Sequence, residues 1–139
     1  MSNDAIISAQ VEETGESAYA VSIDVSGHRI KGDEPVAFGG GNLGPAPYDL
    51  LLAALGECTA MTVRWYARQQ QWPLEKVEVS LTHQKLDKVD TFEKKVTVHG
   101  AALTSEQRRK LVEVAEKCPV QRTLQSDVVI RTVGYTPFE

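Results

Sequence analysis

One long helical pattern, from Pro47 to Gln70, constrains the fold of this chain more than any other feature. Pro47 suits the first turn of a helix, Asp49 suits the positive end of its dipole, and Trp72-Pro73 ends the pattern. The stretch is apolar on most of its sides, which predicts a largely buried helix. A chain of 139 residues offers little sheet to cover such a helix. We therefore expect an obligate two-fold dimer that buries well above ~2,000 Å² in total, with the N-terminal strands shared across its interface.

Alternating apolar and polar residues mark the predicted strands. These strands cover residues 6–11, 19–25, 28–30, 77–83, 92–99 and 127–133, and residues 86–91 form a long, charged connection in the second hairpin. A second helix begins at Thr104 or Ser105, because Thr104 and Gln107 match a capping box. It ends at Cys118, and Pro119 starts a further short turn. This order predicts an α+β fold with helices packed on antiparallel sheet, and a single domain over residues 1–139.

Composition and charge exclude several classes of function. The chain has no charged and apolar leader, which argues against secretion, and its longest apolar run is too short to cross a bilayer. The net charge of −4 is spread without a basic stripe, which argues against a nucleic-acid partner. We therefore expect a cytoplasmic protein that binds neither nucleic acid nor membrane.

The two cysteines, Cys58 and Cys118, are the candidate functional residues. A dithiol that opens and closes performs two-electron chemistry without a cofactor, and a reducing compartment favours that role over a structural bridge. The competing interpretation for Cys58, which lies among leucines and alanines, is a small buried apolar side chain. No close cluster of cysteine and histidine predicts a metal site, and no histidine is placed as the base of a cysteine hydrolase. We assign Lys94, Lys95 and residues 108–110 to solvated faces.

Local sequence makes Cys118 the better thiolate of the two. Cys58 lies in mid-helix, where the helix dipole does not favour ionisation, and Glu57 beside it opposes ionisation. Cys118 directly precedes Pro119, so it can be the N-cap of the following turn, with Arg122 one turn further on.

Two motifs resemble a known family. Residues 39–62, which include Gly44-Pro45-Ala46-Pro47 and Gly56-Glu57-Cys58, are similar to the first cysteine motif of the OsmC/Ohr family, and residues 118–124 are similar to its second. The resemblance implies an intertwined homodimer with two active sites built from both subunits. It also implies a thiol peroxidase that reduces organic hydroperoxides, with hydrogen peroxide as a further candidate substrate, and that dithiols, often lipoyl-linked, recycle. By position, Cys58 would attack the peroxide and Cys118 would resolve it.

The sequence departs from the peroxidases of that family at two places. Their glutamate ten positions before the first cysteine is Tyr48 here, and the acid stands one later, at Asp49. Their activating arginine follows the first strand, where residues 12–17 contain none, which leaves Arg29 and Arg122 as candidate supporting cations. These departures favour an alternative function. In that alternative the protein is a catalytically weak member of the fold that binds a small apolar ligand between its subunits.

Overall fold

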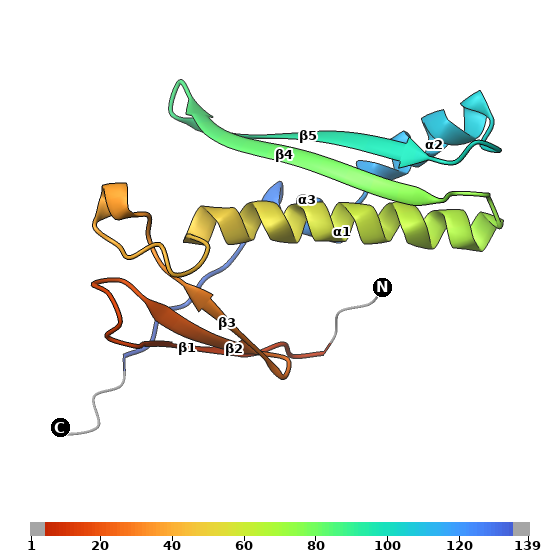
Figure 1. Cartoon of the computed structure of the whole chain (residues 1–139). Helices are drawn as coiled ribbons and strands as arrows, with labels where there is room; N and C mark the ends of the chain where they lie inside the picture. Colours follow the sequence, from red (N-terminus) through yellow and green to blue (C-terminus); the bar gives the residue numbers. More distant parts are fainter. Residues whose placement is uncertain (1–4, 135–139) are drawn as a thin grey trace. The chain divides into compact units, whose positions relative to one another are not determined.

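The computed structural model describes residues 5–134, and its strands and helices lie in two compact units that divide between Ala53 and Ala54 (Figure 1). The elements in chain order are β1 (Ala9–Glu13), β2 (Val21–Val25), β3 (His28–Gly32), the 3-10 helix η1 (Val36–Phe38), α1 (Pro47–Gln70), β4 (Lys76–Leu86), β5 (Val89–His99), α2 (Ser105–Ala115) and α3 (Pro119–Leu124). This confirms the predicted α+β class with antiparallel sheets.

The first unit contains a three-stranded antiparallel sheet in the order β1-β2-β3. Ile23 in the central strand pairs with Val11 on one side and Ile30 on the other. Ser26 and Gly27, both with positive φ, form the tight turn between β2 and β3, as two-residue hairpin turns require. The predicted N-terminal strands are therefore present, although β1 begins at Ala9 and not at residue 6.

A buried carboxylate, Asp33, organises the loop that follows this sheet. Its oxygens accept hydrogen bonds from the Ser17 hydroxyl at 2.9 and 3.0 Å. They also accept from the backbone N–H groups of Glu34 at 2.8 Å, Gly41 at 3.0 Å and Leu43 at 3.2 Å. Burial by itself raises the pKa of Asp33, but these donors outweigh it and the net pKa lies below the usual aspartate value.

Gly40 and Gly44 in this loop allow backbone to approach backbone. A Cβ at Gly40 would lie 2.0 Å from the carbonyl oxygen of Glu34, and a Cβ at Gly44 would lie 2.2 Å from that of Lys31. Both approaches are too close for any side chain. The glycine-rich sequence is thus explained by a tightly folded loop.

Helix α1 has the predicted bounds, and residues 5–134 cover it along one stripe only. Its 24 residues include six buried ones, which are Leu55, Gly56, Thr59, Thr62, Val63 and Ala67. Gly56 lets the helix approach the hairpin, since a Cβ there would lie 2.7 Å from Leu81 Cδ1. Met61 and Trp65, by contrast, are more than half exposed, at 55% and 52%.

Strands β4 and β5 form one long antiparallel hairpin that runs beside the second part of α1 (Figure 1). Pairing extends from Lys76 and His99 to Leu86 and Val89. The predicted long connection over residues 86–91 is therefore wrong, because only Asp87 and Lys88 form the turn. Both have positive φ, 49° and 69°, and a two-residue turn of this kind matches the twist of the strands, so pairing continues to its edge.

The core of the second unit lies between α1, the hairpin and α2. It consists of Val63, Ala67, Leu74, Leu103, Leu111 and Ala115, with Tyr66, Trp72, Val77, Val96 and Val98 packed around it. The predicted capping box starts α2, because the Thr104 side chain accepts from Gln107 N and the Gln107 side chain accepts from Thr104 N. No helix among residues 5–134 is long and apolar enough to cross a bilayer.

The chain after α3 differs from expectation. The strand predicted over residues 127–133 is wrong, since residues 127–134 form no strand. Val129 and Ile130 there are 73% and 85% exposed. An alternating apolar pattern becomes a strand only where a sheet edge accepts its hydrogen bonds. In the described part of the chain β4 pairs with β5 alone, and no strand pairs with this segment.

Replacing the central core residue tests this packing. Leu111 is fully buried, so Leu111→Ala should lower the free energy of unfolding by about 2–5 kcal/mol in urea denaturation followed by circular dichroism. The control is Val112→Ala on the same helix, where the side chain is 45% exposed and a much smaller loss is expected. Equal losses for the two variants would contradict the assigned core.

The Asp33 site predicts a pH dependence. Because its pKa is lowered in the folded chain, the stabilisation by the ionised carboxylate is present above the unfolded pKa of about 3.9 and is lost as pH falls through the folded pKa. We expect Asp33→Asn to be less stable than wild type at pH 7, and its unfolding midpoint to depend less on pH below about 4. Parallel midpoint-against-pH curves for the two proteins would show that Asp33 is not the group responsible.

Candidate functional site

The fold brings the two cysteines to one place, where α1 meets the start of α3. Both are free thiols. The backbone N–H of Val120 donates to Cys58 Sγ at 3.5 Å, and the next amide, that of Gln121, donates to Cys118 Sγ at 3.4 Å. The two thiols are close enough for each to shift the pKa of the other. Consecutive amides of one helical turn therefore hold both sulfurs side by side.

The dipeptide Cys118-Pro119 explains this arrangement locally. Helix α2 ends at Ala115 rather than at Cys118, and Cys118 adopts an extended conformation with φ −65° and ψ 135°. Pro119 then starts α3, which its fixed φ favours. The thiol of Cys118 occupies the place that a serine hydroxyl or aspartate carboxylate takes at other N-caps. This is the N-cap role predicted from sequence.

Burial and ionisation distinguish the two thiols. Burial raises the pKa of Cys58, and the Cys118 sulfur raises it further, against the opposing effect of the Val120 N–H and the Thr62 hydroxyl. Burial also raises the pKa of Cys118, but the Gln121 N–H, the Thr59 hydroxyl, the Cys58 thiol and the charge of Lys94 together bring it below the ordinary thiol value. Cys118 is fully buried and Cys58 only partly so. The more acidic thiol is thus the less accessible one.

Lys94 is a member of this site that the sequence analysis placed on a solvated face. Its Nζ donates to Thr59 Oγ1 at 2.9 Å and to the carbonyl oxygen of Ala115 at 2.8 Å. The assignment holds for the exposed Lys95 but is wrong for Lys94, which is partly buried. The signal that could have found it is strand alternation, since Lys94 is in phase with the inward-facing Phe92 and Val96.

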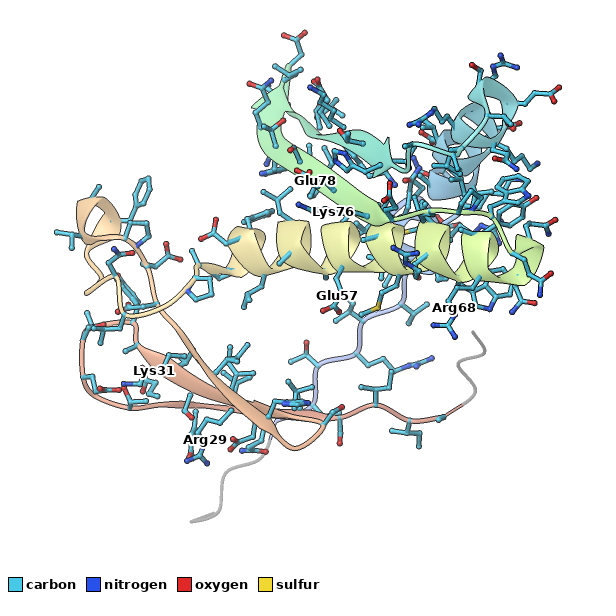
Figure 2. All side chains as sticks on the ribbon, turned by 45° about the vertical axis from the view of Figure 1, so that its right-hand side comes forward. Arg29, Lys31, Glu57, Arg68, Lys76 and Glu78 are labelled. Carbon is cyan, nitrogen blue, oxygen red and sulfur yellow. The ribbon has the colours of Figure 1, made fainter. Side chains whose placement is uncertain are left out.

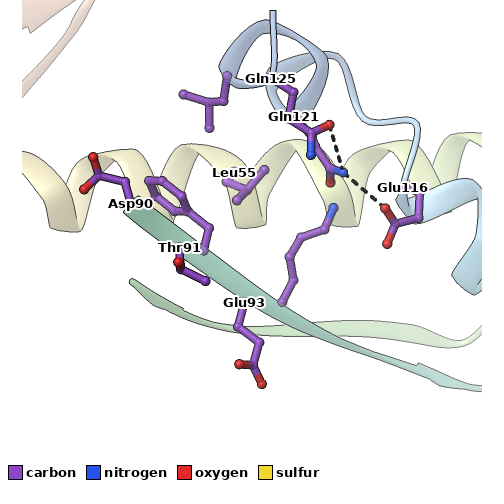
Figure 3. Close-up of a pocket in the computed structure, with 10 residues that line it drawn as sticks. Leu55, Asp90, Thr91, Glu93, Glu116, Gln121 and Gln125 are labelled. Atoms are coloured by element: carbon purple, nitrogen blue, oxygen red, sulfur yellow. Dashed lines mark hydrogen bonds between the residues drawn. The ribbon is translucent and has the colours of Figure 1, made fainter. Parts of the chain in front are cut away.

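A cavity of about 550 Å³ lies between α1, β5 and α3 (Figure 3). Its lining includes the apolar Leu55, Phe92 and Leu124 and the polar Asp90, Thr91, Glu93, Lys94, Glu116, Gln121 and Gln125. Gln121 Nε2 donates to Glu116 at 3.2 Å and to Gln125 at 3.5 Å, so this side chain is fixed at the cavity wall. The cavity therefore combines apolar surface with charged and hydrogen-bonding groups.

The supporting residues predicted from sequence have other partners or are exposed. Asp49 accepts a hydrogen bond from Ala46 N at 2.9 Å and so caps the start of α1. Arg29 forms a bidentate ion pair with Asp24 on the exposed surface of the three-stranded sheet (Figure 2). Arg122 is exposed on α3. Within residues 5–134, no group of three or more cysteine, histidine or acidic side chains is placed to hold a metal ion.

Antiparallel sheets, a long helix and a partly buried pair of free thiols define a class of α+β dithiol proteins. A model of the OsmC-like protein family matches residues 39–133, so the chain belongs to the OsmC-like family. No curated protein matches the sequence.

Solved structures share this fold at low sequence identity. The OsmC like protein from Mycoplasma pneumoniae is 17% identical, with a TM-score of 0.73 over 88% of this chain and 89% of that one. An organic hydroperoxide resistance protein OsmC from Legionella pneumophila is 17% identical, with a TM-score of 0.65 over 89% and 92%. The organic hydroperoxide resistance protein OhrB of Bacillus subtilis is 18% identical, with a TM-score of 0.61 over 88% and 93%.

Proposed function

We propose that this protein is a thiol peroxidase that reduces organic hydroperoxides through Cys58 and Cys118. The observation that carries the proposal is the placement of two free thiols on consecutive amides, Val120 and Gln121, of one helical turn. Two structural relatives named as organic hydroperoxide resistance proteins support the substrate class. Hydrogen peroxide is the inorganic peroxide to compare with organic hydroperoxides as a substrate.

The exposure of the thiols supports an order of events. Cys58 is the thiol that a peroxide can reach, because Cys118 is fully buried. A bond forms between Cys58 Sγ and the outer oxygen of R–O–O–H, the O–O bond breaks, and the alcohol leaves. The resulting sulfenic acid then reacts with the Cys118 thiol, which forms the disulfide and releases water. A second dithiol, of the lipoyl class, reduces this disulfide and becomes oxidised itself.

The same proposal includes a homodimer in the cytoplasm, where thiols are kept reduced. Its support is the uncovered side of α1, where Met61 and Trp65 are exposed. These residues border a depression of about 550 Å³ together with Ala60, Arg64, Arg68, Glu75, Lys76 and Val77. A second copy of the chain would cover this apolar helix face.

A peroxide-consumption assay tests the activity. With dithiothreitol or dihydrolipoamide as reductant, wild type should consume cumyl hydroperoxide faster than hydrogen peroxide over many turnovers. Cys58→Ser should lose turnover, because the attacking sulfur is absent. In the absence of added dithiol, Cys118→Ser should consume about one equivalent and then stop, with a trappable sulfenic acid at Cys58.

The outcomes separate two functions. If the reduced, folded wild type consumes neither peroxide with any dithiol, the peroxidase proposal is wrong and the ligand-binding alternative is favoured. Sulfenic acid trapped at Cys118 in Cys58→Ser would instead reverse the order of the two thiols. Circular dichroism of each variant confirms that lost activity does not reflect lost folding.

Sedimentation velocity tests the assembly. We expect wild type to sediment as a dimer at micromolar concentration, because the interface should bury well above ~2,000 Å². Trp65→Asp should shift the protein toward monomer, since a carboxylate would have to be buried in an apolar contact. A wild-type monomer throughout a micromolar dilution series would contradict the proposal.

A further inference from the structure

The ammonium group of Lys94 is held beside the thiol pair rather than in solvent. Two acceptors, Thr59 Oγ1 at 2.9 Å and the Ala115 carbonyl oxygen at 2.8 Å, fix its position. Thr59 is itself fully buried, its hydroxyl donates to the Leu55 carbonyl oxygen at 2.8 Å, and it helps to lower the pKa of the Cys118 thiol. Lys94 therefore places a positive charge between Thr59 on α1 and the end of α2, three residues before Cys118.

The other charged groups around the thiol pair do not cancel the effect of the Lys94 charge on the Cys118 thiol. They are Glu57 on α1, Asp90 and Glu93 on β5, Glu116 and Lys117 between α2 and α3, and Arg122 on α3. Asp90 lies 3.0 Å from His83 Nε2 and forms an ion pair with Lys85, and Glu116 accepts from Gln121. Glu57, Glu93, Lys117 and Arg122 are exposed, where water screens them.

We propose that Lys94 is a positioning residue that keeps the negative charge of the resting thiol pair on Cys118, and that Cys118 then takes the proton of Cys58 when Cys58 attacks. This inference rests on the proposed peroxidase function. It explains how the accessible thiol can react although the neighbouring, buried thiol is the one whose charge is stabilised.

In the resting pair Cys58 carries its proton, and Cys118 is a thiolate next to the Lys94 ammonium. The proton moves from Cys58 Sγ to Cys118 Sγ as Cys58 Sγ bonds to the outer oxygen of the hydroperoxide and the O–O bond breaks. The hydroperoxide proton stays on the oxygen now bound to Cys58, which makes the sulfenic acid, and the leaving alkoxide takes a proton from solvent and departs as the alcohol. Cys58 has lost two electrons, and Cys118 is now the neutral thiol that condenses with the sulfenic acid and releases water.

Two observations support this distribution of charge. Each sulfur receives one backbone N–H, so the amides alone do not distinguish the thiols. Lys94 also donates to the carbonyl oxygen of Ala115, which lies three residues before Cys118. The directions of the two pKa values agree, because that of Cys58 is raised and that of Cys118 is lowered, with the Lys94 charge among the causes.

The first experiment measures ionisation without any peroxide. Thiolate absorbance at 240 nm is titrated against pH in wild type and in the variants Cys58→Ser and Cys118→Ser. We expect wild type and Cys58→Ser to show one thiolate with a midpoint below about 8.5, and Cys118→Ser to lack it. A low midpoint that stays in Cys118→Ser would assign the charge to Cys58 and overturn the proposal.

Lys94 variants are compared in the same titration. Lys94→Met should raise the low midpoint by about one pH unit, and Lys94→Arg, which keeps the charge, should restore most of it. Lys94→Gln provides a second neutral variant if Lys94→Met folds poorly. Lys95→Met is the matched control, because Lys95 is the exposed neighbour on the same strand. An unchanged midpoint in folded Lys94→Met and Lys94→Gln would overturn the role of Lys94.

The second experiment follows the first equivalent of cumyl hydroperoxide in a single turnover between pH 5 and 9. Cys118→Ser and Lys94→Met should both be roughly tenfold slower than wild type at pH 7 and should approach its rate at high pH, where Cys58 ionises unaided. Lys94→Arg and Lys95→Met should resemble wild type. A loss in Lys94→Met that is equal at every pH indicates only a structural role and overturns the proposal.

The outcomes distinguish a failure of the peroxidase proposal from a failure of the charge assignment. An unreactive wild type that still shows a low midpoint at Cys118, dependent on Lys94, would contradict the peroxidase function but support the charge assignment. A reactive wild type whose rate and midpoint do not respond to Lys94 or Cys118 would support the peroxidase function and overturn this inference.

Discussion

The N-cap contact between Cys118 Sγ and the Gln121 amide is the interaction on which the site depends. Pro119 fixes the start of α3, and the cap orients the Cys118 thiol toward the helix axis. The adjacent amide, that of Val120, then lies within reach of Cys58 on α1. One helix of six residues thereby positions two sulfurs that are far apart in the sequence.

Features set by neighbours along the chain were predictable from the sequence. The bounds of α1, the capping box of Thr104 and Gln107, and the cap formed by Cys118 each follow from residues within one or two turns. The errors arose where distant partners decide the outcome. The Asp87-Lys88 turn depends on how far the strands pair, and the strand predicted over residues 127–133 needed a partner strand, which no strand of the described residues provides.

In the candidate site, too, the features set by nearby residues were predictable and those set by distant residues were not. The cysteine pair could be inferred from two motifs, and the N-cap could be inferred from one dipeptide. Lys94 was missed because a lysine beside another lysine looks solvated, although its phase with Phe92 and Val96 placed it inward. Lys94 lies on β5, and its partners Thr59 and Ala115 come from the helices α1 and α2. No local pattern in the sequence could therefore predict the contact.

The N-cap of α3 is a thiol, which can be oxidised or alkylated, whereas a serine or aspartate N-cap does not undergo this chemistry. When Cys118 forms a disulfide or is alkylated, its sulfur becomes a poorer acceptor for the Gln121 amide. Oxidation of the thiol would therefore weaken the cap at the start of residues 119–124. Because Gln121 and Leu124 of this helix line the cavity, a change at this cap would reach the cavity wall and the surface met by an incoming peroxide or reductant.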